Sequence, residues 1–232
     1  MSLDLNAVFK APFQDEKWVS KVLIGGVFEI LILPIFLPLG YGIKIMKSAI
    51  EGEMAPLPDW DEWGDLSVKG LLCILISLIY FLIPGGILGA SVVPFVLAIL
   101  KGEHGGGGGG IAALMGGSLL LFLLGLFLCI VAGFLLPMAL LLFAETGNWL
   151  SALSLGAVIS RIKDCIGDYA IAFLVNIAAG MAIGTVVGIL GMVMIGYLIG
   201  PFLQFYQTIL MSQLFGQVYR NLRSKTSLAT EA

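Results

Sequence analysis

Long stretches without a charged side chain constrain this sequence more than any other feature. The longest runs from Tyr169 to Tyr219, and two others cover Gly70 to Leu100 and Gly105 to Ala144. About 20 consecutive apolar residues are enough to cross the hydrocarbon core of a membrane as a helix. Since backbone groups in lipid must find hydrogen-bond partners within the protein, each run is predicted to be helical. The sequence therefore predicts an all-α fold, a polytopic integral membrane helical bundle.

The composition supports this class and argues against others. Charged residues make up 12% of the chain, about half of the roughly 25% that is usual in soluble domains. The formal net charge is −3, whereas nucleic-acid-binding surfaces are basic. We therefore expect membrane lipid as a partner and no nucleic acid.

The longest run must turn, because its 51 residues would form a helix roughly 76 Å long at about 1.5 Å per residue. The hydrocarbon core of a bilayer is only about 30 Å thick. Gly200 and Pro201 are the predicted turn, since glycine accepts unusual dihedral angles and proline starts helices well. The six glycines at 105–110 predict a flexible connector. Four spans are therefore predicted over residues 70–100, 111–144, 169–199 and 201–219.

The first apolar stretch, residues 22–43, contains Glu29 and Pro34 and allows two topologies. If it breaks near Pro34 and returns to the same side, 11 lysines and arginines lie on one side of the membrane and 1 on the other. If it spans once as a proline-kinked helix, the division is 8 against 4. Lysine and arginine prefer the cytoplasmic side. The counts favour a re-entrant or proline-broken hairpin in a multi-pass protein of the inner (cytoplasmic) membrane, with both termini in the cytoplasm.

The next segment, residues 47–69, is an acidic and aromatic elbow that contains PLPDWDEWGD. The spacing of its acids fails the calcium pattern of an EF-hand, because Trp63 and Gly70 occupy ligand positions. Tryptophans favour the membrane interface, and Asp65 is suited to cap the following helix. The elbow is therefore predicted to be an interfacial anchor or docking surface whose acids can pair with Arg161 and Lys163. Its candidate residues are Asp59, Trp60, Asp61, Trp63 and Asp65.

A different kind of segment covers residues 148–166. Asn148 can cap a helix, and apolar residues follow at roughly helical spacing before a charged end. This pattern predicts an interfacial helix along the cytoplasmic face, with an ordinary loop as the alternative. Residues 1–225 are expected to form a single membrane domain, and residues 226–232 a disordered tail.

Few polar residues interrupt the apolar runs. Glu29 is the one acid well inside such a run, and an intramembrane charge usually contacts an ion, relays a proton or pairs with another group. Its alternative is a shallow position that water reaches. Asn176, Gln204 and Gln207 either line a polar path or hydrogen-bond neighbouring helices.

Three glycines repeat at every fourth position, Gly180, Gly184 and Gly188. This spacing lets helix backbones approach closely, either within the fold or between two copies of the chain. The pattern therefore predicts a helix-packing face.

Motifs of catalysis and metal binding are missing from the sequence. The single histidine, His104, excludes an HExxH zinc motif, and no GxSxG serine motif occurs. The three cysteines lack the spacing of a metal site. We expect no cofactor, no metal ligand and no catalytic residue, and thus a protein that is not an enzyme.

Several segments together resemble a known family. They are KAPFQDEKW from Lys10, LGYGIKIMKSAIEGE from Leu39, LPDWDEWGDLSVKGL from Leu57 and GYLIGPFLQFYQTILMSQLFGQVYR from Gly196. This combination resembles the prokaryotic membrane proteins catalogued as domain of unknown function 4013. The resemblance implies a compact multi-helix membrane domain and implies no reaction.

Two functions are compatible with these features. The first is a non-catalytic scaffold, assembly factor or regulatory subunit, which would contact a cytoplasmic or membrane protein or form a homo-oligomer. The second is a small permease or channel-like protein that would use broken helices and intramembrane polar residues.

Overall fold

The computed structural model describes residues 3–31, 35–100, 108–192 and 194–230, and every regular element within them is helical. The predicted break at Pro34, His104 and residues 105–107 of the glycine connector lie outside the described residues, and residues 108–110 of the connector are helical. Among the described residues, three helical segments are long and apolar enough to cross a membrane, namely Trp63–Val93, Gly116–Thr146 and Ile166–Gly191. The elements in order are α1 Leu5–Lys10, the 3-10 helix η1 Ala11–Gln14, α2 Trp18–Ile30, α3 Phe36–Glu51, α4 Trp63–Leu100, α5 Gly108–Thr146, α6 Trp149–Ala152, α7 Leu155–Asp164, α8 Ile166–Gly191 and α9 Ile195–Thr230.

The chain divides into two compact units. One contains Met1–Ile74 together with Pro137–Ala232, and the other is Leu75–Leu136. The smaller unit consists of the later part of α4 and the earlier part of α5, which lie side by side. Its helices touch where Gly125 meets Leu88, since a Cβ on Gly125 would come within 2.8 Å of the leucine side chain.

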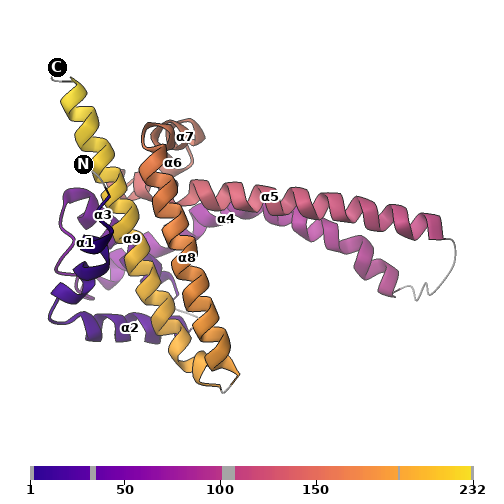
Figure 1. Cartoon of the computed structure of the whole chain (residues 1–232), viewed down its shortest axis with the longest axis horizontal. Helices are drawn as coiled ribbons and strands as arrows, with labels where there is room; N and C mark the ends of the chain where they lie inside the picture. The colour runs from indigo at the N-terminus through magenta and orange to yellow at the C-terminus, as the bar shows by residue number, and fades with distance from the viewer. Residues whose placement is uncertain (1–2, 32–34, 101–107, 193, 231–232) are drawn as a thin grey trace. The chain divides into compact units, whose positions relative to one another are not determined.

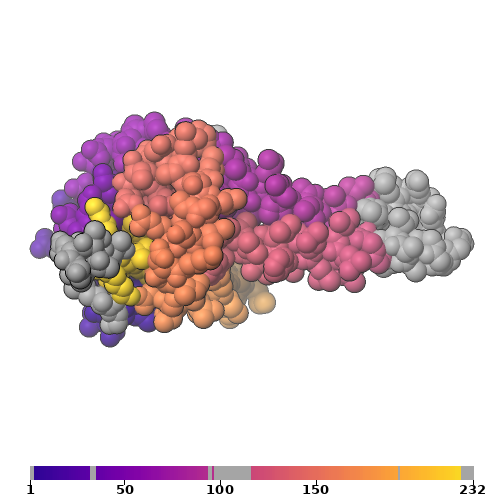
Figure 2. Space-filling model, turned by 90° about the horizontal axis from the view of Figure 1, so that it is seen from above, coloured from indigo at the N-terminus to yellow at the C-terminus, as the bar shows by residue number. Residues whose placement is uncertain are grey.

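The core of the larger unit is built around α9. Phe205, Ile209, Phe215 and Tyr219 on this helix are fully buried. Figure 1 shows α8 and α9 as an antiparallel pair, with α2 crossing near the beginning of α9. Figure 2 shows α8, in orange, at the surface of this unit. Apolar side chains on α8 such as Leu174 therefore stay exposed to whatever surrounds the protein.

The turn between α8 and α9 corrects the prediction made at Gly200 and Pro201. Helix α8 ends at Gly191, α9 begins at Ile195, and Pro201 lies inside α9. The cause is close backbone approach at Gly196, where a Cβ would lie 2.3 Å from the carbonyl oxygen of Val187. The glycine that permits this turn, and not the glycine before the proline, marks the boundary.

The predicted span at 201–219 belongs to α9, which is not among the three helices that meet the length and apolarity of a span. Its polar side chains, such as Gln204 and Gln207, lower its hydropathy. Its apolar face is covered by protein, whereas only 6% of the most apolar window of α8 is buried. Helix α9 is thus a core helix of its unit.

Glycines let α9 and α4 pack closely against the N-terminal helices. A Cβ on Gly216 would lie 2.5 Å from the Cβ of Ala49 in α3. A Cβ on Gly40 would lie 2.0 Å from the carbonyl oxygen of Leu66 in α4. A Cβ on Gly70 of α4 would come closer still, 1.7 Å from the carbonyl oxygen of Phe36 in α3. At these positions the helices of this unit approach more closely than at the predicted glycine repeat.

The stretch 22–43 forms parts of two helices, α2 and α3, with residues 32–34 between them not described. The predicted helical nature of 148–166 is confirmed by α6 and α7. Asn148 caps α6, because its side chain accepts a hydrogen bond from the backbone nitrogen of Leu150 at 3.1 Å. Helix α9 continues to Thr230, into the segment predicted to be a disordered tail.

Candidate functional site

The elbow is held by a buried ion triad. The Lys21 ammonium lies 2.8 Å from an oxygen of Asp15 and 2.9 Å from an oxygen of Asp59. It also donates a hydrogen bond to the carbonyl oxygen of Leu57, whose own backbone nitrogen donates to Asp15 at 3.0 Å. Lys21 and Asp15 are only 6% and 5% exposed. The triad therefore ties the loop between α3 and α4 to the beginning of α2.

Pairing keeps all three groups of the triad charged. Burial alone would lower the pKa of Lys21, but its hydrogen bonds and charge interactions with Asp15 and Asp59 outweigh burial and raise that pKa. Burial would raise the pKa of Asp15, and the bonds to Lys21 outweigh it and lower the pKa. The hydrogen bond from Lys21 lowers the pKa of Asp59. Buried charges persist only when they are paired in this way.

Aromatic side chains fix the same loop from its other side. The Trp60 indole stacks on the Tyr41 ring at a centroid distance of 4.3 Å and an interplanar angle of 10°. Its ring nitrogen donates to the carbonyl oxygen of Lys21 at 3.1 Å, and the Tyr41 hydroxyl donates to the carbonyl oxygen of Pro58 at 2.7 Å. Phe205 of α9 packs against both rings. Trp60 is thus a core residue that is covered by protein, and its position at the level of the lipid headgroups stays a prediction.

The exposed acids of the elbow form a rim, which we define as Asp59, Asp61, Glu62 and Asp65. Asp59 is thus the exposed member of the triad, whereas Lys21 and Asp15 are buried. Lys44 of α3 lies 2.7 Å from Glu62 and 3.6 Å from Asp61. The side chains of Asp59 and Asp61 remain 69% and 68% exposed. Asp59, Asp61 and Glu62 pair with Lys21 and Lys44 of the N-terminal helices. The sequence had suggested Arg161 and Lys163 as the partners of the elbow acids.

Two further details of the rim differ from expectation. Helix α4 begins at Trp63, so Asp65 lies within its first turn and does not cap it. Asp65 instead pairs with Lys69 at 2.6 Å, one turn further along the helix. Trp63 is 45% exposed, so it is the tryptophan of the elbow that remains available for lipid or for another protein.

Arg161 and Lys163 lie at the end of α7. The Arg161 guanidinium lies 5.7 Å from the ring centroid of Tyr219. The Tyr219 hydroxyl donates a hydrogen bond to Glu145 near the end of α5. This second cluster therefore joins α5, α7 and α9 within the larger unit.

A cavity of about 560 Å³ lies between α2, α3, α8 and α9. Four polar side chains line it, Glu29 from α2 and Tyr197, Gln204 and Thr208 from α9. The rest of its wall is apolar residues and glycines, and the structure brings Gly180 and Gly184 to it. The full lining is Glu29, Ile35, Pro38, Leu39, Gly180, Ile183, Gly184, Val187, Gly196, Tyr197, Gly200, Pro201, Gln204 and Thr208.

Glu29 is the one charged residue of this cavity. Its side chain is half-buried, and within the described residues it has no hydrogen bond or ion pair. The Thr208 hydroxyl donates to the carbonyl oxygen of Gln204 at 3.2 Å, which leaves the hydroxyl oxygen able to accept. The cavity thus combines one carboxylate with neutral acceptors and an apolar wall.

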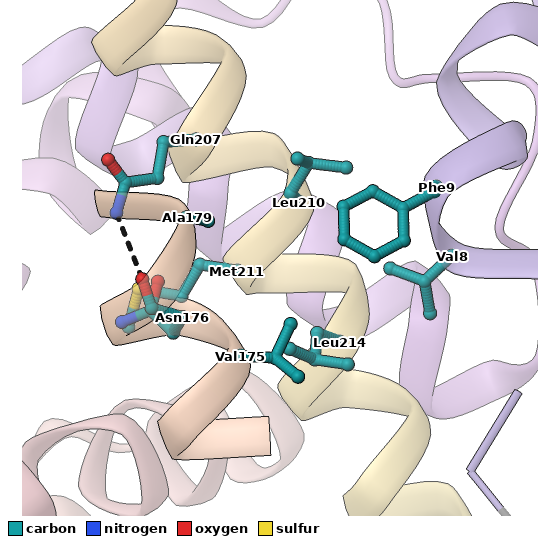
Figure 3. Close-up of a pocket in the computed structure, with 9 residues that line it drawn as sticks. All are labelled: Val8, Phe9, Val175, Asn176, Ala179, Gln207, Leu210, Met211 and Leu214. Atoms are coloured by element: carbon teal, nitrogen blue, oxygen red, sulfur yellow. Dashed lines mark hydrogen bonds between the residues drawn. The ribbon is translucent and has the colours of Figure 1, made fainter. Parts of the chain in front are cut away.

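Asn176 and Gln207 lie outside this cavity. The Gln207 side-chain nitrogen donates to the carbonyl oxygen of Asn176 at 3.5 Å and connects α9 to α8 (Figure 3). The space beside them, bordered by Val8 and Phe9 of α1, measures only about 10 Å³. That volume is about one water molecule, so these two residues have the geometry of a helix-to-helix contact.

The predicted glycine face meets a neighbouring helix at one position only. A Cβ on Gly180 would lie 2.8 Å from the Gln207 side chain, whereas a Cβ on Gly184 or Gly188 would meet nothing within 4 Å. Close helix packing at Gly184 and Gly188 is therefore not shown. In the described part of the chain, no group of three or more histidine, cysteine or acidic side chains is placed to hold a metal ion.

Sequence reasoning missed Asp15, Lys21, Tyr41 and Lys44. Asp15 and Lys21 lie only six residues apart, and the elbow at residues 47–69 has six acids against two lysines. That imbalance was the available signal. The sequence did not identify the lysine that pairs with Asp59, because Lys21 and Asp59 are brought together only by the fold.

One comparison with known proteins gives a match. The family model described as "Protein of unknown function (DUF4013)" matches residues 27–195. This range includes Glu29, the whole elbow and α8, and it excludes Asp15, Lys21 and all of α9 after its first residue. No curated protein and no solved structure matches the chain.

Proposed function

The chain belongs to the DUF4013 family, whose function is unknown, and we propose that it is a non-catalytic membrane scaffold or regulatory subunit. The elbow is its docking surface for a protein partner. It is a multi-pass protein of a prokaryotic cytoplasmic membrane, with the elbow and both termini in the cytoplasm.

The arrangement of helices supports this topology. Helices α4, α5 and α8 are long and apolar enough to span, and α9 runs antiparallel to α8 and packs on it. In the proposed topology α9 is the fourth crossing, although it is less apolar than the other three helices. Four crossings return the chain to its starting side. Lysines and arginines near the beginning of α4 and the end of α9 then share the cytoplasmic face, as the distribution of basic residues in membrane proteins favours. In this topology α2 and α3 form the re-entrant hairpin.

One observation supports the docking role. The residues that hold the elbow in place, Lys21 and Asp15, are buried, whereas the acids of the rim are exposed. Burying charges is costly, yet the chain buries Lys21 and Asp15 to hold a loop whose own acids are largely exposed. A rigid exposed loop loses little conformational freedom when a partner binds it. This geometry suits recognition better than it suits membrane anchoring.

The rim also indicates the chemistry of the partner. Asp59, Asp61 and Glu62 carry exposed carboxylates, and Trp63, which directly follows Glu62 in the chain, is 45% exposed. Arginine side chains pair with carboxylates and stack on aromatic rings. The partner is therefore a protein that presents an arginine- or lysine-containing segment to the cytoplasmic side of the membrane.

Photo-crosslinking from the rim tests this proposal. A photoreactive phenylalanine derivative replaces Trp63 in cells that make the full chain, and crosslinked proteins are identified by mass spectrometry. The double variant Asp61→Lys/Glu62→Lys should abolish the crosslinks, and Asp164→Lys is the matched control because Asp164 is an exposed acid of α7. Crosslinks that persist after charge reversal, or that high salt leaves unchanged, would contradict the docking role.

A second candidate function rests on the cavity at Glu29. Two of the predicted transport residues, Glu29 and Gln204, line one cavity, as a permease or channel-like protein would require. Solute flux into liposomes that contain the purified protein tests this function. Flux that Glu29→Gln and Gln204→Leu both abolish would favour it, and the absence of flux for every solute class tried would leave the scaffold as the better account.

A further inference from the structure

We propose that the cavity between α2, α3, α8 and α9 is a binding site for an amphipathic ammonium ion, a single cationic nitrogen attached to an apolar body. The proposal concerns the site of the second candidate function and names its ligand class. It does not require transport, because a site can bind a ligand without moving it.

The size of the cavity argues for a molecule and against a bare ion. Its volume is about 560 Å³, within the range of about 300–1,000 Å³ that is usual for small-molecule sites. Divalent metal ions need several oxygen ligands at short distance. Glu29 is the single acid of the lining, which is too few for such an ion.

The charge of the cavity sets the charge of the ligand. Glu29 has no partner within the described residues, and the lining contains no lysine, arginine or histidine. A half-buried carboxylate in an apolar wall is stabilised by one positive charge placed beside it. The accepting oxygens of Gln204 and Thr208 add neutral positions for the hydrogen atoms of an ammonium group.

The apolar walls of the cavity indicate that the rest of the ligand is apolar. Ile183, Val187 and Leu39 present aliphatic surface, and Tyr197 adds an aromatic ring. Burying an apolar body against aliphatic surface favours binding. A tyrosine ring attracts ammonium groups. A strongly hydrated ligand such as a sugar would lose water on binding without gaining hydrogen bonds from these apolar walls.

The glycines explain why the space exists. Gly180 and Gly184 of α8 and Gly196 and Gly200 of α9 all line the cavity. At Gly184 the nearest atoms lie beyond 4 Å of a Cβ position, so this glycine does not serve close packing. Gly184, one member of the predicted packing repeat, instead keeps part of the volume between the two helices free of a side chain.

The ammonium group has two sources, a soluble amine or the headgroup of an aminophospholipid. Both present the same cationic nitrogen on an apolar body. The binding experiment separates them by the lipid in which the protein is reconstituted.

The test uses the full chain in nanodiscs of phosphatidylglycerol, a lipid without an ammonium group. Tritiated phenylbutylamine is the probe, and phenylbutanol, which has nearly the same shape without the charge, is the comparison. The wild-type protein should bind the amine saturably and at least about ten-fold more tightly than the alcohol, as the loss of a charge-assisted contact implies. Glu29→Gln should weaken amine binding by a similar factor and leave alcohol binding unchanged.

Two glycine variants distinguish the cavity from the helix that lines it. Gly184→Leu should fill the space and abolish amine binding. Gly188→Leu is the matched control, because Gly188 lies one turn away in α8, meets nothing within 4 Å and does not line the cavity. Circular dichroism verifies that both variants are folded.

Each outcome decides the matter. Competition by added phosphatidylethanolamine would identify the lipid headgroup as a source, and unaltered amine binding in its presence would identify a soluble amine. Equal binding of amine and alcohol, no saturable amine binding, or amine binding that Glu29→Gln leaves intact would overturn the proposal. Amine binding without flux in liposomes would support the site and refute transport.

Discussion

Replacing Lys21 by methionine tests the buried ion triad most directly. The substitution keeps an apolar side chain of similar length and removes the ammonium that bonds to Asp15, Asp59 and the carbonyl oxygen of Leu57. Asp15 is 5% exposed, so its carboxylate would stay buried without its cation.

The expected loss is large because the remaining charge is buried. Removing one partner of a buried ion pair usually costs about 3–5 kcal/mol of stability, and we expect Lys21→Met to lower the free energy of unfolding by about this amount. Asp59→Asn is the contrasting variant. The Asp59 side chain is 69% exposed, and exposed ion pairs contribute about 0–1 kcal/mol.

Equilibrium unfolding in mixed micelles, followed by circular dichroism as the fraction of denaturing detergent rises, measures these differences. The double variant Lys21→Met/Asp15→Asn should regain about 1–3 kcal/mol relative to Lys21→Met, because it removes the uncompensated buried charge. The reasoning would be refuted if Lys21→Met cost no more than Asp59→Asn. It would also be refuted if the double variant were less stable than Lys21→Met alone.

Three further predictions concern stability and topology. Since the pKa values of Asp15 and Asp59 are lowered from 3.8, their stabilising contribution is complete above that value and is lost as the pH falls through their folded pKa values. The free energy of unfolding, measured as a function of pH, should show this loss at low pH. Asp15→Asn should reduce the slope of the free energy of unfolding against pH. Gly40→Ala places a Cβ 2.0 Å from a backbone oxygen of α4 and should destabilise by about 1–3 kcal/mol in the same unfolding assay. Gly167→Ala, which meets nothing within 4 Å, should be neutral or stabilising, and equal effects of the two would contradict the packing argument. Finally, Gly64→Cys in a chain freed of its native cysteines should react with an impermeant maleimide in inverted vesicles. Reaction in intact cells instead would place the elbow outside.

The helices were predictable where the local sequence decides the structure. Charge-free runs that exceed the length of a span predict α4, α5 and α8, and the Asn148 cap depends on contacts two residues away. The boundary between α8 and α9 was not predictable from Gly200 and Pro201. It depends on the close approach of Gly196 to Val187, which becomes visible only when the two helices are side by side.

For the candidate sites, too, some features follow from the local sequence and others depend on contacts that only the fold creates. That Glu29 is an unusual acid follows from its apolar neighbours in the sequence, but its shared cavity with Gln204 requires α2 and α9 to meet. That Trp60 belongs to the core depends on Tyr41 and Phe205. Tryptophan in a membrane protein suits both an interface and a core, and only the packing partners distinguish the two.

The larger unit joins the two ends of the chain, and this has a consequence for biosynthesis. Residues Met1–Ile74 leave the ribosome before α9 does, but their core needs Phe205 and Ile209 from that helix. The elbow can close on Lys21 early, whereas Phe205, which packs on its aromatic rings, arrives only with α9. A nascent chain that stops before α9 would thus leave the aromatic face of the elbow uncovered.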